Sequence, residues 1–230
     1  MANMTRRAWL AAGGAASVAT GFAGSVVAAC RPADGNNPYH FQSIPPRELF
    51  QQRHFPNVQL ITHEGKKVHF YDDLVKDRKV VMNVMYSNCQ KACPMTTANL
   101  VRVQKILSDR IGHDIFMYSI TLKPEEDSPK VLKKYAKEHG VGPGWLFLTG
   151  KPGDIELLRH SLGFVSTIPR KANDKSSHIN LLRFGNEPYL RWAACPAQAP
   201  AGWVATSILS ETDGPLKGGL KGENSALSPQ

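Results

Sequence analysis

The sequence predicts a layered α/β domain built on a mixed β-sheet, from three observations. Apolar, β-rich segments alternate along the chain with segments whose apolar residues recur at helical spacing. The last two strand-like segments are joined by a tight turn, so they must run antiparallel. Two cysteines, Cys89 and Cys93, lie between an apolar strand and a helix that starts at Pro94. This layout is typical of a thioredoxin-like fold, here a peroxiredoxin-like variant with an N-terminal hairpin.

The length of 230 residues suits one ordinary domain with tails. A polar stretch with Pro, Gly and Asn precedes the domain, and a segment rich in Gly, Ser, Lys and Pro follows it. The predicted divisions are an export signal at 1–30, a tether at 31–54, the domain at 55–210 and a disordered tail at 211–230.

The first 30 residues resemble an export signal, because Arg6-Arg7 are followed by an apolar run without a charge. Thr5-Arg-Arg-Ala-Trp-Leu10 resembles a twin-arginine signal, and an ordinary secretory signal is the alternative. Val27-Ala-Ala-Cys30 resembles a lipobox, in which Cys30 would become the lipidated first residue; soluble cleavage and an uncleaved anchor remain open. We therefore expect an exported bacterial protein, lipid-anchored on the periplasmic side of the inner membrane.

The formal net charge is +9 and the pI is about 9.5. A positive net charge of this size is compatible with an ordinary solvated surface, with binding to an anionic membrane or with binding to an acidic partner. No Arg-rich stripe is interleaved with aromatic residues, so the sequence argues against nucleic-acid binding.

The domain is expected to open with a β-hairpin that turns at Glu64-Gly65, with His63 and His69 as surface or half-buried residues on its arms. Residues 80–86 are apolar and β-rich, which predicts a central strand covered on both faces. Apolar residues then recur at helical spacing from Met95 to Ser108, which predicts a core-facing helix with Pro94 in its first turn.

The rest of the chain continues the alternation of strands and helices. Ser128-Pro129 is expected to open a helix that Gly140 ends, and Asp154 to cap another that Gly163 ends. The remaining predicted elements are strands at 115–122, 145–148, 178–184 and 189–192, a polar loop at 166–177, a turn at Gly185-Asn186, and a last helix at 203–209.

The two thiols lie at or just before a helix N-terminus, where free N–H groups and the helix dipole favour negative charge. We therefore expect thiolate to form more easily there than at an ordinary cysteine. Three intervening residues let both sulfurs converge on one ion or close a redox-active disulfide. A purely structural disulfide is the weaker alternative, because a short loop gains little from cross-linking.

Soft thiolates in an exported protein select Cu(I) or Zn(II), and a structural zinc site would require four ligands. Two cysteines and one histidine suit three-coordinate Cu(I) better. Among the eight histidines, His178 opens an apolar strand after a long polar loop. In thioredoxin-like folds the start of that strand faces the cysteine loop, so we expect His178 to be the third ligand rather than a structural histidine.

Several segments together resemble the Sco/SenC family over roughly residues 55–192. They are Cys89-x-x-x-Cys93-Pro94, Thr97-Ala-Asn-Leu100, Tyr118-Ser-Ile-Thr-Leu-Lys-Pro-Glu-Glu-Asp-Ser-Pro129, Leu132-x-x-Tyr135-Ala, Trp145-Leu-Phe-Leu-Thr-Gly150 and the late His178. The resemblance implies copper, Cu(I) or Cu(II), bound by Cys89, Cys93 and His178. We expect these ligands to hold the copper at an exposed loop. It also implies that the protein delivers copper to the CuA centre of cytochrome c oxidase or reduces the cysteines of that centre.

The implied partners are the oxidase subunit that carries CuA, a thiol reductant or another copper carrier, and a membrane through the N-terminal anchor. The sequence departs from the family pattern at Lys123 and Ser177, where the family usually has acidic residues. Cys195 is unexplained: a buried thiol, the partner of a transient disulfide and an extra ligand are all open.

The rival interpretation is a thiol–disulfide oxidoreductase that uses Cys89 and Cys93 without metal. Such enzymes usually carry a cis-proline where this chain has Ser177-His178, and the nearest preceding proline is Pro169, which favours metal binding. A peroxide-reducing enzyme is less favoured, because no Thr-x-x-Cys arrangement is present. The sequence thus predicts a metallochaperone rather than an enzyme, with no separate catalytic residue.

Overall fold

A computed structural model of the chain describes residues 44–89, 92–166 and 180–213. The predicted export signal with Cys30, the predicted ligand His178 and the tail from residue 214 lie outside the described residues. Within the described ranges, no helix is both long and apolar enough to cross a bilayer.

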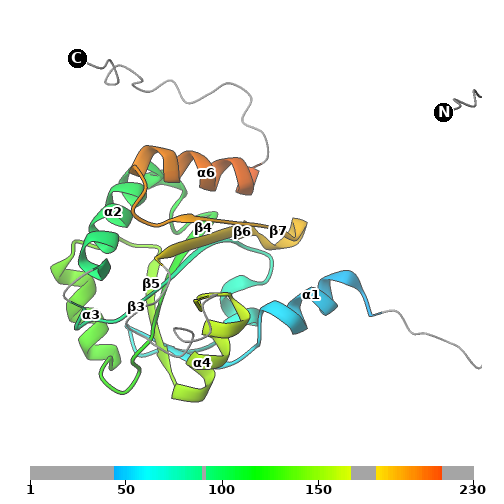
Figure 1. The fold of residues 1–230 in the computed structure, drawn as a ribbon, viewed down its shortest axis with the longest axis horizontal. Coiled ribbons are helices and arrows are strands. Elements are labelled where there is room, and N and C mark those ends of the chain that lie inside the picture. The colour runs from blue at the N-terminus through cyan, green and yellow to red at the C-terminus, as the bar shows by residue number, and fades with distance from the viewer. Residues whose placement is uncertain (1–43, 90–91, 167–179, 214–230) are drawn as a thin grey trace, which may run out of the picture. The chain divides into compact units, whose positions relative to one another are not determined.

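The predicted mixed α/β fold is confirmed by a seven-stranded sheet in the order β2-β1-β5-β4-β3-β6-β7 (Figure 1). The strands are β1 (Gln59–Thr62), β2 (Lys67–His69), β3 (Lys79–Met85), β4 (Ile115–Thr121), β5 (Trp145–Gly150), β6 (Leu181–Asn186) and β7 (Arg191–Pro196). The three strands β3, β4 and β5 are parallel, and all other pairings are antiparallel. The predicted hairpin is β1–β2, which joins the sheet through β5.

Helices cover both faces of the sheet. They are α1 (Pro46–His54), α2 (Ala92–Ile106), α3 (Pro129–Glu138), α4 (Pro152–Ser161) and α6 (Ala201–Asp213), together with the π-helical segment η1 (Phe70–Val75) and the short 3-10 segments η2 (Ser108–Arg110) and η4 (Glu187–Tyr189). One apolar core lies between the sheet and α2, α3 and α6, and a second lies between the sheet and η1 and α4. Figure 1 shows α2 and α6 next to each other on one side of the sheet.

The side chains of strand β3 contribute to both apolar cores, one on each face of the sheet. All its residues after Lys79 are buried, as predicted for a strand covered on both faces. Val81 and Met85 face the first core, whereas Val80, Met82 and Val84 face the second. This alternation follows from the two-residue period of a strand.

Helix α1 occupies the last nine residues of the segment predicted to be a tether. Arg47 in α1 donates two hydrogen bonds to the Glu187 carboxylate, at 2.8 and 2.5 Å. Glu187 is only 1% exposed, and it also accepts hydrogen bonds from the Tyr71 hydroxyl and the Asp77 backbone N–H. A long-range ion pair therefore attaches residues before 55 to the domain.

The closing strands and two helix ends also differ from the prediction. Strand β6 includes Gly185 and Asn186, and the chain turns one residue later through η4. Helix α4 starts after Lys151, so Asp154 lies in its first turn and does not cap it. Helix α6 extends to Asp213, into the predicted tail, because Asp213 forms ion pairs with Lys79 and Arg110.

Candidate metal centre

The predicted metal centre begins at the carboxyl end of β3, in the interior of the sheet between β4 and β6. The chain leaves the strand after Met85, reaches Cys89 four residues later, and Cys93 lies in the first turn of α2. The two cysteines are 6% and 3% exposed and belong to the first apolar core. They are therefore buried, and the prediction of an exposed loop is wrong for the sulfurs themselves.

Both cysteines are thiols, and the side chain of Cys89 is hydrogen-bonded to that of Cys93. Burial, with a smaller contribution from the hydrogen bond to Cys89, raises the pKa of Cys93 to about 12. For Cys93, this contradicts the expectation that the helix N-terminus makes thiolate easier to form. The cost of burying a charge in the apolar core exceeds the stabilisation of the thiolate by backbone hydrogen bonds, including one from the N–H of Cys93 itself.

The third predicted ligand, His178, lies outside the described residues, and the structure describes the chain again from Asn180, two positions later. Asn180 accepts a hydrogen bond from the Thr96 hydroxyl on α2, with an oxygen–oxygen distance of 2.8 Å. The backbone carbonyl of Asn180 accepts a hydrogen bond from the N–H of Ala197 at 3.0 Å. These contacts fix the chain just before β6 beside the first turns of the helix that carries Cys93.

The described residues contain no group of three or more His, Cys, Asp or Glu side chains that could bind a metal ion. The structure thus brings together two of the three predicted ligands, Cys89 and Cys93. His63 and His69 lie on the hairpin as predicted, half-buried and exposed respectively. The Nδ1 atom of His63 accepts a hydrogen bond from the Phe147 N–H at 3.0 Å, and burial lowers the pKa of this histidine.

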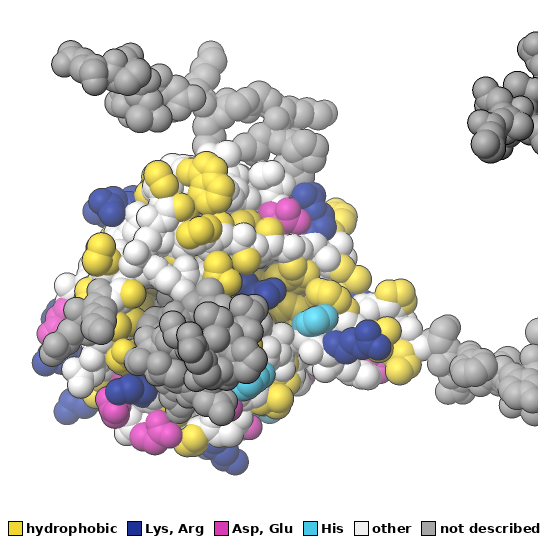
Figure 2. All heavy atoms as spheres, viewed as in Figure 1, with side chains coloured by type: hydrophobic (Ala, Val, Ile, Leu, Met, Phe, Trp, Pro, Cys, Tyr) yellow, Lys and Arg dark blue, Asp and Glu magenta, His cyan; other side chains and the backbone are white. Residues whose placement is uncertain are grey.

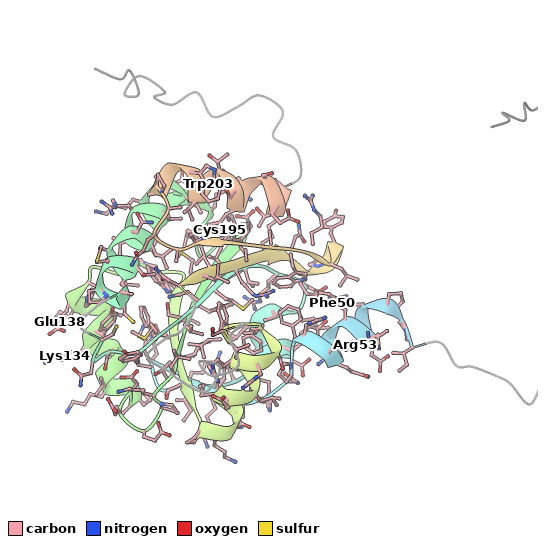
Figure 3. The ribbon with its side chains drawn as sticks, viewed as in Figure 1. Phe50, Arg53, Lys134, Glu138, Cys195 and Trp203 are labelled. Carbon is pink, nitrogen blue, oxygen red and sulfur yellow. The ribbon has the colours of Figure 1, made fainter. Side chains whose placement is uncertain are left out.

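Cys195 lies within β7, opposite Leu182, and not after the last strand as predicted (Figure 3). Its side chain is buried in the same apolar core as Cys89 and Cys93. Burial raises the pKa of Cys195 to about 11. The structure therefore describes a buried core thiol, the first of the three alternatives that the sequence leaves open.

The sequence analysis did not predict a role at the site for two polar residues near the sulfurs, Tyr135 and Asp127. Tyr135 of α3 shares a hydrogen bond with the Thr97 hydroxyl of α2 at 3.0 Å, and burial raises its pKa to about 12, with smaller contributions from Cys93, Cys89 and Asp127. Asp127 is buried and accepts hydrogen bonds from Ser87. An acidic residue directly before the Ser128-Pro129 helix start was the available signal, but a carboxylate there ordinarily suggests an exposed turn.

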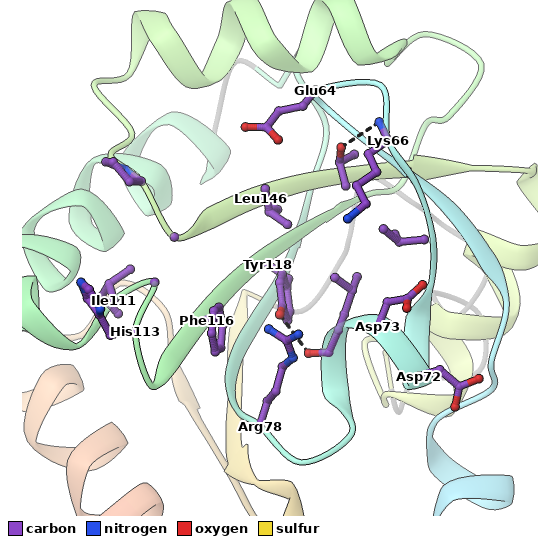
Figure 4. Close-up of a pocket in the computed structure, with 16 residues that line it drawn as sticks. Glu64, Lys66, Asp72, Asp73, Arg78, Ile111, His113, Phe116, Tyr118 and Leu146 are labelled. Atoms are coloured by element: carbon purple, nitrogen blue, oxygen red, sulfur yellow. Dashed lines mark hydrogen bonds between the residues drawn. The ribbon is translucent and has the colours of Figure 1, made fainter.

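The described part of the chain also has a pocket of about 530 Å³ near the amino ends of the parallel strands, the opposite end of the sheet from the thiols (Figure 4). Phe116 and Leu146 line it, and the guanidinium of Arg78 lies 4.6 Å from the centre of the Phe116 ring. The Tyr118 hydroxyl in this pocket donates to the Leu74 carbonyl at 2.9 Å. Neither Cys89 nor Cys93 is among its lining residues, so this pocket is separate from the two thiols.

A family model for SCO1/SenC proteins matches residues 47–182, which is more than half of the chain and includes the thiol loop. The chain belongs to the SCO1/SenC family. A SCO1 protein homolog from Bacillus subtilis is 33% identical to it over 122 residues, which cover 53% of this chain and 61% of that relative. The match thus spans less than two thirds of the relative's length.

Solved structures of Sco proteins have the same fold. Arabidopsis thaliana ScoI with copper bound has a TM-score of 0.53 and 18% sequence identity, with 66% of this chain and 93% of that chain covered. BsSco, described as a Sco family cytochrome c oxidase assembly protein with a disulfide switch, has a TM-score of 0.55 and 23% identity, with 66% and 90% covered. At these identities the likeness establishes the thioredoxin-like fold, and the ligands are argued from this chain's own residues.

Proposed function

We propose that this SCO1/SenC protein binds copper through Cys89, Cys93 and His178. It delivers that copper to the CuA site of a terminal cytochrome oxidase, or reduces the cysteines of that site. The observation that carries the proposal is the 2.8 Å hydrogen bond between Thr96 and Asn180, because it ties the strand start next to His178 to the helix that carries Cys93.

The chain lengths allow the imidazole to reach the sulfurs. Two residues of extended chain span about 7 Å, so His178 lies within that distance of Asn180 along the backbone. Thr96 is three residues from Cys93 in α2, which is about one helical turn. The proposal requires the His178 side chain to bridge the remaining distance to the sulfurs.

The donor chemistry also fits copper. The two sulfurs are hydrogen-bonded to each other in an apolar core, so a single soft ion can contact both. Burial opposes a charged thiolate, and a bound cation supplies the compensating positive charge as the thiol protons leave. The copper-bound Arabidopsis relative and the oxidase assembly relative support assigning the same cargo and client to this chain.

Anaerobic titration with Cu(I) tests the proposal on the wild type and on two histidine variants. We expect one Cu(I) per chain for the wild type and at least tenfold weaker binding for His178→Ala. His63→Ala is the matched control, because His63 lies on the hairpin and hydrogen-bonds Phe147. Absence of stoichiometric copper in the wild type, or equal affinity of the two variants, would contradict the proposed site.

The second candidate function is metal-free thiol–disulfide exchange, and the Cys89–Cys93 hydrogen bond favours it because the sulfurs are already adjacent. The same preparations distinguish the two functions. An oxidoreductase would keep full dithiol activity in His178→Ala and would bind no copper in stoichiometric amount.

The proposed place of action is the periplasmic side of the inner membrane. The twin-arginine-like start and the lipobox-like Val27-Ala-Ala-Cys30 support export and a lipid anchor at Cys30. The tether would then hold the domain near the membrane in which the oxidase resides.

A further inference from the structure

We propose that Asp127 is a positioning residue for the thiol site. Its buried carboxylate holds the start of the loop that carries Cys89 and thereby sets the separation of the two sulfurs. The inference deepens the proposed function and rests on it for the role of Cys89 and Cys93.

The carboxylate connects two elements at the carboxyl end of the sheet. The backbone N–H of Ser87, two residues before Cys89, donates to both Asp127 oxygens at 3.3 and 3.2 Å. The Ser87 hydroxyl donates to Oδ1, and the hydroxyl of Thr121, the last residue of β4, donates to Oδ2. Asp127 thus binds the thiol loop to the end of the neighbouring strand.

The turn that carries Asp127 is itself rigidly held. The Thr121 hydroxyl accepts a hydrogen bond from the Lys123 N–H at 2.9 Å, and the Asp127 N–H donates to the Lys123 carbonyl at 2.9 Å. The Leu122 N–H donates to the carbonyl of Met85, the last residue of β3, at 2.8 Å. The loop therefore starts from a fixed frame on both strands.

Burying the Asp127 carboxylate costs free energy, which would be unusual for a residue that only stabilises a surface turn. Asp127 is 1% exposed, and none of the ion pairs among the described residues includes it. A buried carboxylate is tolerated when donors satisfy its oxygens, and here three donors do so. Because two of them belong to Ser87, most of this stabilisation acts on the residue that leads into Cys89.

The separation of the sulfurs determines how readily they form a disulfide. In exchange with glutathione disulfide, one S–S bond forms between Cys89 and Cys93, the glutathione S–S bond breaks, and the two thiol protons end on two glutathione thiols. The equilibrium constant of this reaction rises with the effective concentration of one sulfur at the other, so a looser loop lowers it.

The test is Asp127→Asn in the full chain, with Glu187→Gln as the matched control. The asparagine NH2 would face a donor from Ser87 or Thr121, so at least one of the hydrogen bonds to residue 127 would be lost while the side-chain volume stays nearly constant. Glu187 is also 1% exposed and accepts hydrogen bonds from three residues, but it connects η4 to α1, η1 and Asp77 and not to the thiol loop. Both variants should lower the unfolding temperature, so that stability alone does not separate them.

The measured quantity is the Cys89–Cys93 equilibrium constant in glutathione buffers, read by alkylation and peptide mass spectrometry. We expect a decrease of at least tenfold in Asp127→Asn, which corresponds to about 30 mV, and a change below twofold in Glu187→Gln. Ser87→Ala removes one of the three donors, so its equilibrium constant should lie between those of the two variants. It also replaces Asp127→Asn as the test variant if that protein does not fold.

Two results would overturn the positioning role. One is a wild-type equilibrium constant in both Asp127→Asn and Ser87→Ala, and the other is an equal shift in Glu187→Gln. Cu(I) titration of the wild type runs in parallel. If the wild type binds no copper, the proposed function fails, whereas the disulfide equilibrium still reports on Asp127.

Discussion

At Cys93, two physical effects act in opposite directions on one sulfur. The N-terminus of α2 favours a negative charge, whereas burial in the apolar core disfavours it, and the raised pKa shows that burial prevails. Lys123, which stands where the family usually has an acidic residue, lies near the same loop. Its ammonium is 4.8 Å from the centre of the Tyr86 ring and 3.1 Å from a Glu126 oxygen. These contacts give the substituted lysine local partners at the protein surface.

Cys195 leads to a prediction at the residue scale. Because burial raises its pKa to about 11, from an ordinary value of 9.0, the folded protein has about a hundredfold less thiolate there at pH 8. We expect slow alkylation of Cys195 in the native protein, with a rate that rises about tenfold per pH unit from pH 8 to 10. Peptide mapping after reaction with iodoacetamide measures this rate, and the urea-unfolded protein is the control.

The linked effect on stability has a definite sign. A thiol whose pKa is higher in the folded protein contributes stability below pH 9, and this stability is lost as the pH rises toward 11. Cys195→Ala should retain wild-type copper stoichiometry and lose about 1 kcal/mol of unfolding free energy for the small cavity. Reduced copper stoichiometry in this variant would show that Cys195 is a ligand.

At the element scale, the parallel strands depend on a close approach between two turns. Gly144 precedes β5, has a φ of +80°, and faces Gly112 in the turn before β4. A Cβ atom on Gly144 would lie 2.4 Å from the backbone nitrogen of Gly112, so a side chain does not fit there. The positive φ of this residue is a second reason for glycine, because other residues rarely adopt it. Glycine at this position lets the connection into β5 pass against the one into β4.

Gly144→Ala should therefore lower the unfolding free energy by at least about 2 kcal/mol, from the strained φ and the backbone clash together. Gly153→Ala is the matched control. Gly153 lies in the first turn of α4, and a Cβ atom there would meet no other atom within 4 Å, so alanine should be neutral or slightly stabilising. Urea denaturation measures both; equal stability of the two variants would show that the turn can shift to accept a side chain.

At the scale of the whole molecule, several charged side chains of the described residues pair in local networks. Arg110 and Lys79 bind Asp114 and Asp213, which joins the end of α6 to the starts of β3 and β4. On the face drawn in Figure 2, Lys and Arg side chains of the described residues appear at separate places among hydrophobic and acidic ones. The net charge of +9 therefore does not by itself locate a docking surface for an acidic partner.

The proposed lipid anchor is a prediction at this scale. Cys30→Ala should move the protein from the membrane fraction to the soluble periplasmic fraction, because it removes the residue that would carry the lipid. Fractionation with a detergent phase-separation assay measures the change, and Cys195→Ala is the control cysteine variant. Persistence of the Cys30 variant in the membrane fraction would favour an uncleaved N-terminal anchor.

The sequence alone determined the α/β class, the N-terminal hairpin, the position of most strands and helices, and the family. These follow from local information: period-two and helical apolar patterns, Pro and Gly at element ends, and the Cys-x-x-x-Cys spacing. It also placed Cys89 correctly in the loop after β3, whereas α2 starts at Ala92, two residues before Pro94, and so includes Cys93.

Only the tertiary structure decided the environment of those thiols. Their burial, the raised pKa of Cys93, the Asp127 contact to Ser87 and the Thr96–Asn180 hydrogen bond all join residues from different elements. The same holds for α1, which forms part of the domain through the Arg47–Glu187 ion pair across 140 positions of the chain. Such effects depend on which residues pack together in space, and local sequence patterns carry no information about that.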